Sequence, residues 1–115
     1  MIAKRSWDVE LARAAKRDFI EIIAYTHETF GACQAKIYED LLADAIDSLV
    51  DGPDAIGSKS REDISPGVCS LHITLGGRGG RHFVMYRANE NERVIDVLRI
   101  LHDASDLARH IPGES

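Results

Sequence analysis

The 115-residue sequence is poor in cysteine. Its two cysteines, Cys33 and Cys69, stand far apart and belong to neither a Cys-x-x-Cys pair nor a Cys/His set with metal-ligand spacing. This excludes a disulfide framework and a cysteine-based metal centre. We expect two reduced, largely buried thiols, with a catalytic cysteine as the alternative.

Long apolar runs are also absent, since no segment approaches the roughly 18 residues that a membrane-spanning helix needs. Lys4 and Arg5 lie near the N-terminus, but no apolar stretch follows them, so we expect no secretion signal and a cytoplasmic protein without membrane association. Hydrophobic residues make up 44% and charged residues 29% of the chain. This composition and length predict a single globular domain over residues 1–115.

Positive charge is in short supply. Fourteen Lys and Arg residues face 19 Asp and Glu residues, for a net charge of −5, whereas phosphate-binding proteins usually carry a positive field. The imbalance lies mostly in residues 1–51, while the basic residues of the second half are nearly all arginine. Arginine suits protein interfaces. The charge balance therefore favours a protein partner, although nucleic-acid binding is not excluded.

The apolar pattern changes period along the chain. Residues 7–11 alternate between apolar and polar, which predicts a half-buried strand. From about residue 12, apolar residues recur every three or four positions and predict a helix that Gly31 ends. A second helical pattern runs to Asp51-Gly52-Pro53. The short connection makes the two helices antiparallel neighbours.

The second half of the chain predicts strands. Residues 52–67 have the composition of a loop, and strand patterns follow at 69–75, 83–86 and 94–101, with hairpin turns at 76–80 and 88–92. The tail from Ala104 to Ile111 predicts one or two helical turns. The order is β-α-α-β-β-β, an α+β fold with both helices on one face of a mainly antiparallel sheet. We expect the opposite face to be more polar and open to a partner.

Motifs for a cofactor or metal are not found. None of the five histidines pairs with another at i, i+4 on a helix, so we expect no metal site and no cofactor. The segment Gly76–Arg81 is rich in glycine but lacks the Gly-Lys of a phosphate-binding loop, and it leads from strand to strand rather than into a helix. It is typical of a hairpin.

Arginine and histidine gather in the second half of the chain. The group comprises Arg78, Arg81, His82, Tyr86, Arg87, Arg93, Arg99 and His102. Strand alternation places Arg81, Phe83 and Met85 on one face and His82, Val84 and Tyr86 on the other. Such side chains could hold a phosphodiester, and the candidate catalytic residues are Arg81, His82, Arg99 and His102. Equally, they could form ion pairs with Asp96, Asp103 or Asp106, or meet an acidic partner.

The sequence resembles ParE-type toxins of the RelE/ParE superfamily over nearly its whole length. The matching segments are 15–22, Phe30-Gly31 with Ala35, 67–72, 80–87, 97–103 and 106–111. Tyr86-Arg87 followed by Leu98-Arg99-Ile100-Leu101-His102 is the most specific part. One position departs from the family, because Ala12 occupies the slot where Ser or Thr usually caps the first helix, a loss of about 1 kcal/mol.

The resemblance implies a RelE-like fold and a toxin of a type II toxin–antitoxin pair, either plasmid-maintaining or chromosomal. Such a toxin is neutralised in a hetero-oligomeric complex by a ParD-like antitoxin, and it meets operator DNA only through that antitoxin. The ParE branch is associated with poisoning DNA gyrase and the RelE branch with cleaving messenger RNA on the ribosome. A non-toxic member that only binds its antitoxin is a third alternative.

The basic residues favour the ParE branch. The chain has only four lysines, and residues 104–115 contain no tyrosine, whereas RelE-like cleavage relies on several basic residues and a C-terminal tyrosine. We therefore expect gyrase inhibition by protein contact. The expected antitoxin-binding residues are Arg17, Phe19, Ile23, Tyr25 and Tyr38. The expected target-binding residues are Arg81, Arg87, Arg99, His102, Asp106, Arg109, His110 and Ile111.

Overall fold

The computed structural model describes residues 7–54, 57–75 and 78–104. Its elements are β1 (Asp8–Leu11), α1 (Arg13–Phe30), α2 (Ala32–Asp47), the 3-10 turn η1 (Ser48–Asp51), β2 (Ser58–Ser60), β3 (Val68–Leu75), β4 (Arg78–Asn89) and β5 (Val94–His102). The predicted order of strand, two helices and three strands is confirmed. The predicted helical tail lies, beyond Ala104, outside the described residues.

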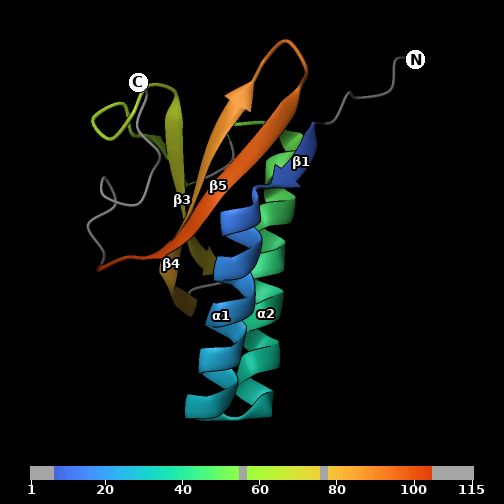
Figure 1. Cartoon of the computed structure of the whole chain (residues 1–115), viewed down its shortest axis with the longest axis vertical. Coiled ribbons are helices and arrows are strands. Elements are labelled where there is room, and N and C mark those ends of the chain that lie inside the picture. The colour runs from blue at the N-terminus through green and yellow to red at the C-terminus, as the bar shows by residue number, and fades with distance from the viewer. Residues whose placement is uncertain (1–6, 55–56, 76–77, 105–115) are drawn as a thin grey trace.

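The strands form one sheet in the order β1-β5-β4-β3-β2. β1 pairs with β5 in parallel, and the other neighbours are antiparallel. The strand β2 was not predicted, because Ser58-Lys59-Ser60 has no apolar alternation and pairs along the outer edge of β3 through its backbone. Figure 1 shows α1 and α2 side by side against one face of the sheet, and the connected end of this helix pair extends beyond the strands. No helix in the described part is both long and apolar enough to cross a membrane.

A single residue, Gly31, connects α1 to α2. Gly31 adopts a φ of 95°, a conformation that favours glycine, and its N–H donates to the His27 carbonyl at 2.9 Å. At the other end of α1, Ala12 provides no side-chain cap. Instead, its N–H donates to the Val97 carbonyl at 2.9 Å, which fixes the start of α1 to β5.

The main core lies between the helices and the sheet. Leu42 on α2, Leu49 on η1, and Val84 and Tyr86 on β4 are fully buried there. The Tyr86 hydroxyl donates to the Pro53 carbonyl at 2.6 Å, which satisfies its polar end within the core. Alternation along β4 thus places His82, Val84 and Tyr86 toward the helices, as predicted.

The opposite face of the sheet is not the open, polar surface that we expected. Val68, Met85 and Leu101 form a second buried cluster there, and Ile64 packs against it. Ile64 lies in the loop before β3, so this loop covers part of the face. Arg87 holds the loop, because its guanidinium donates to the Ser65 hydroxyl and the Pro66 carbonyl, both at 3.2 Å.

The glycine-rich turn between β3 and β4 is shorter than the predicted turn at residues 76–80, because β4 already begins at Arg78. Gly80 therefore lies within a strand rather than in the turn. A Cβ atom at this position would collide with the Ile73 carbonyl oxygen and side chain. Close approach of β3 and β4, rather than turn formation, is what requires glycine here.

The expectation of two buried thiols is wrong for Cys33, which is exposed, while Cys69 is partly buried. Cys33 lies in the first turn of α2, at the end of the helix pair that extends beyond the sheet. No strand lies there to cover its side chain. Burial raises the pKa of the Cys69 thiol, which keeps it protonated and unreactive near neutral pH.

Candidate functional site

A groove with a volume of about 560 Å³ lies between the helix pair and the ends of β4 and β5. Its walls are formed by Glu21, Ile22, Tyr25, Thr26, Phe30, Gln34, Tyr38, Arg81, His82 and His102. Two of these side chains are large, aromatic and mostly exposed: Tyr25 at 63% and Phe30 at 64%. Neighbouring exposed aromatic side chains that line a groove are typical of a surface that binds another molecule.

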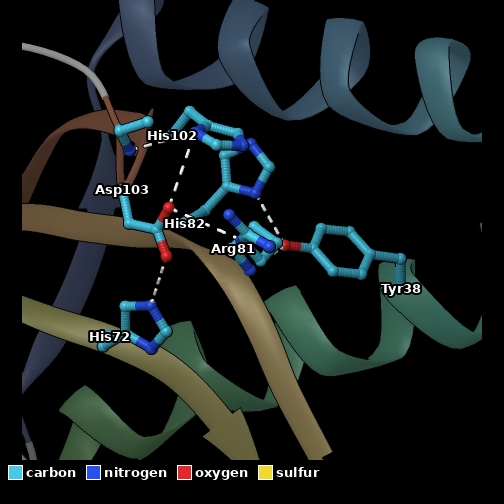
Figure 2. Close-up of polar contacts among 7 residues, drawn as sticks. Tyr38, His72, Arg81, His82, His102 and Asp103 are labelled. Carbon is cyan, nitrogen blue, oxygen red and sulfur yellow. Dashed lines mark hydrogen bonds and ion pairs between the residues drawn. The ribbon is translucent and has the colours of Figure 1, made fainter.

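One end of the groove is polar. Figure 2 shows Tyr38 on α2 facing His82 on β4, with the Tyr38 hydroxyl 2.6 Å from His82 Nδ1. The backbone N–H of Arg81 donates to the same hydroxyl at 2.9 Å. The hydroxyl can still donate its own proton while it accepts from Arg81, and in the tautomer in which Tyr38 donates to Nδ1, His82 carries its proton on Nε2. These two bonds join the middle of α2 to the start of β4.

His82 is held neutral by its surroundings. Burial, and to a lesser extent the nearby His102, lower the pKa of His82 from 6.5 to about 4, because both effects disfavour a positive charge. The two imidazole rings lie 5.2 Å apart, centroid to centroid, in an edge-to-face arrangement. Burial also raises the pKa of Tyr38, so the hydroxyl stays protonated. The pair is therefore a neutral hydrogen bond rather than an activated nucleophile and base.

Asp103, just after β5, contacts a histidine and an arginine side chain (Figure 2). Its carboxylate lies 3.1 Å from His72 Nε2 on β3 and 3.6 Å from Arg81 Nε. The His72 hydrogen bond holds the pKa of Asp103 below its usual range, with Arg81 acting in the same direction. The carboxylate thus remains ionised and balances the charge of Arg81.

His102 accepts a hydrogen bond through one of its ring nitrogens. The backbone N–H of Ala104 can only donate, and it donates to His102 Nδ1 at 3.0 Å. Nδ1 therefore carries a lone pair, and the 3.5 Å separation between this atom and the Asp103 carboxylate is not an ion pair in the neutral form. Protonation of His102 would exchange the Ala104 bond for a contact with Asp103.

Arg99 has a structural partner. Its Nε and Nη2 atoms donate to the two carboxylate oxygens of Asp18 at 2.7 and 2.9 Å, and the Ile100 N–H donates to the same carboxylate at 2.9 Å. Asp18 is only 8% exposed. The contact raises the pKa of Arg99, so the guanidinium stays charged and ties α1 to β5.

The residues proposed for antitoxin binding separate into two groups. Tyr25 and Tyr38 line the groove. Phe19 and Ile23 are partly buried against the main core, and their contact with the antitoxin stays a prediction. Arg17 is exposed but is not part of the groove wall.

The residues proposed for catalysis or target binding are also divided. Arg81, His82 and His102 come together at the polar end of the groove. Arg87 bonds to the loop before β3, and Arg99 is bound to Asp18, so both have partners within the fold, and their role in target binding stays a prediction. The tail candidates Asp106, Arg109, His110 and Ile111 lie outside the described residues.

Sequence reasoning missed Phe30 as a groove residue. The three-and-four spacing assigned it to the buried stripe of α1, yet it is 64% exposed. Phe30 lies next to Gly31, at the end of α1 that extends beyond the sheet. This position next to the helix-ending glycine is the signal that could have identified it. His72 was missed as a partner of Asp103, because 31 positions separate the two residues in sequence.

We predict that folding stability depends on pH through His82. Unfolded chains take up the proton near pH 6.5, whereas the folded protein resists it until about pH 4. Between these values the unfolded state binds more protons than the folded state. The free energy of unfolding is therefore highest above pH 6.5 and falls progressively toward pH 4. The expected result is a declining midpoint of urea unfolding over this interval.

Glutamine at position 82 keeps a hydrogen-bond acceptor for Tyr38 but cannot titrate, so His82→Gln should flatten the decline. His27→Gln, a change at an exposed histidine on α1, should leave it intact. Asp103 acts in a lower interval, because its pKa is already below 3.8. An unchanged pH profile in His82→Gln would contradict this assignment.

Comparison with known proteins identifies the family. Residues 9–107 match the sequence pattern described as ParE toxin of type II toxin-antitoxin system, parDE. The chain belongs to the ParE toxin family. Two curated relatives, both called Toxin ParE1 and each from a different strain of Mycobacterium tuberculosis, are 34% identical to this chain over 101 residues. The aligned region covers 88% of this chain and 94% of each relative.

Solved structures share the ParE fold. A chain of the chromosomal ParDE TA system from P. aeruginosa superposes with a TM-score of 0.65 at 21% identity, over 84% of this chain and 95% of that chain. A chain of the toxin-antitoxin complex RelBE2 from Mycobacterium tuberculosis gives 0.58 at 19% identity, over 90% of this chain and 98% of the other. The α+β fold of the RelE/ParE type, predicted from the sequence, is therefore confirmed.

Proposed function

We propose that a ParD-like antitoxin neutralises this toxin by placing an amphipathic segment in the groove between the helix pair and the sheet. The observation that carries the proposal is the exposure of Tyr25 and Phe30 along that groove. Burying two large aromatic side chains provides the kind of anchor on which tight protein interfaces depend. The relatives named ParDE and RelBE2 are themselves toxin–antitoxin assemblies, which supports the same kind of partner here.

We further propose that the free toxin inhibits DNA gyrase by protein–protein contact, without catalysing a reaction. Two of the basic residues that could assist phosphodiester cleavage already have structural partners. Arg99 is bound to Asp18, and Arg87 to the loop before β3. His82 is neutral and bonded to Tyr38. The net charge of −5 also disfavours association with ribosomal RNA.

The test compares two purified systems. Wild-type toxin should inhibit supercoiling by DNA gyrase and leave ribosome-bound messenger RNA intact, and the antitoxin encoded by the adjacent reading frame should reverse the inhibition. His102→Gln removes acid–base ability while keeping a polar side chain, so its gyrase inhibition should stay within about threefold of wild type.

Cleaved messenger RNA with unaffected gyrase would move the protein to the RelE-like alternative. Binding to the antitoxin with neither activity would indicate a non-toxic member. Failure to co-purify with the antitoxin would contradict the pairing itself.

A further inference from the structure

We propose that the polar end of the groove is a carboxylate-binding subsite whose occupation is linked to uptake of a proton. The subsite is formed by Arg81, His82 and His102, and its ligand is an Asp or Glu side chain of the antitoxin segment in the groove. This inference rests on the proposed antitoxin binding. It adds the chemistry of one partner residue and the pH dependence of the complex.

The subsite offers hydrogen-bond donors without matching acceptors. His102 accepts from Ala104 through Nδ1 and carries its proton on Nε2, and His82 does the same in the tautomer in which Tyr38 donates to its Nδ1. In the part of the chain that the structure describes, neither Nε2 atom has a hydrogen-bonding partner. The Arg81 side chain is 70% exposed and contacts Asp103 through Nε. A carboxylate can accept from several such donors at once.

The charge balance links binding to protonation. With every histidine neutral, the charges of Arg81 and Asp103 cancel, so the subsite has little net attraction for an anion. Protonating His102 adds one positive charge, and the Asp103 carboxylate, 3.5 Å from Nδ1, is already in place to accept the new N–H. A bound carboxylate therefore favours the protonated form, and acidification must strengthen binding.

Other charged groups around the histidines leave this direction unchanged. The titratable groups from the surrounding elements are Asp18 and Glu21 on α1, Tyr38 on α2, His72 on β3, Arg81 on β4 and Asp103 after β5. Asp18 is neutralised by Arg99, and His72 donates to Asp103. Glu21 lies on the helix wall of the groove. The negative charge of Glu21 also disfavours a second carboxylate in the groove, so the added proton has a larger effect on binding.

The experiment measures the affinity of full-length toxin for the full-length antitoxin encoded by the adjacent reading frame, by calorimetry between about pH 8 and pH 6. Wild-type affinity should rise roughly three- to tenfold over this interval, as expected for one linked histidine. His102→Gln should reduce the rise to less than about twofold. Arg81→Met should weaken binding roughly five- to tenfold throughout, because the charged donor is lost. His27→Gln and Arg13→Met are the matched exposed controls on α1, and each should behave as wild type.

The partner supplies the complementary test. Replacing the antitoxin's Asp and Glu residues one at a time by Asn or Gln should identify one position that removes the pH dependence. A flat or falling profile for wild-type toxin, or a rise that survives His102→Gln, would overturn the subsite while leaving antitoxin binding in the groove intact. Failure to bind at any pH would overturn both proposals. The same rise seen with an RNA oligonucleotide and not with the antitoxin would assign the subsite to phosphate and refute the carboxylate.

Discussion

Replacing Asp18 by alanine is expected to lower the free energy of unfolding by about 3 kcal/mol. The Asp18 carboxylate accepts three hydrogen bonds, two from Arg99 and one from the Ile100 N–H, at 2.7 to 2.9 Å. Its removal takes this acceptor away from a guanidinium that is only 25% exposed and from the Ile100 N–H. Breaking such a pair is far more costly than the pair's own net contribution to stability.

Asp40→Ala is the matched control for this loss. Asp40 also forms an ion pair on a helix, with Lys36 at 3.2 Å, but the two side chains are 60% and 69% exposed. Water screens the pair, so its loss should cost far less stability than the loss of the Asp18 carboxylate. Urea unfolding of the two variants provides the measurement, and similar losses in both would contradict the structural role of Asp18.

Arg99→Lys should fall between these limits, because lysine cannot reproduce the two-pronged contact with the Asp18 carboxylate. A loss of toxicity in that variant would therefore be accompanied by a loss of stability. Arg99 is for this reason a poor probe of the gyrase interface. Arg81, which is exposed, is the better choice for testing a direct contact.

Replacing Tyr25 by alanine should weaken antitoxin binding by about 2 kcal/mol, or roughly 30-fold in Kd. Tyr25 lines the groove and is 63% exposed in the free toxin, so a partner can bury most of its ring. The same exposure means that the folded toxin gains little from the side chain. The midpoint of thermal unfolding should therefore change by no more than about 2 °C.

Ile20 provides the comparison on the same helix. Its side chain is large, apolar and 69% exposed, but it does not line the groove. Ile20→Ala should change affinity by less than about threefold, since surface substitutions outside an interface have small effects. A larger effect at Ile20 than at Tyr25, measured by calorimetry on both variants, would place the antitoxin on the outer face of α1 instead.

The element order was predictable because each segment carries its own period. Residues 8–11 alternate as a strand does, the stripe that includes Ala15, Phe19 and Ile22 has the spacing of a helix, and Gly31 marks the turn between helices. These are local properties of the chain. The short strand β2 carries no such pattern, because its three residues are ordered by pairing with β3 rather than by their own side chains.

The sequence alone determined the α+β element order, the pairing of the two helices and the family, since each depends on local periodicity or on motifs read in order. Only the tertiary structure decided which residues are available to a partner. Arg81 and Arg99 look alike in sequence, yet one is exposed at the groove and the other is bound to Asp18, 81 positions away. Likewise, Phe19 and Phe30 share a helical stripe, but only the first lies over the sheet. Burial and ion pairing depend on which distant segments meet, and no local pattern in the chain encodes that.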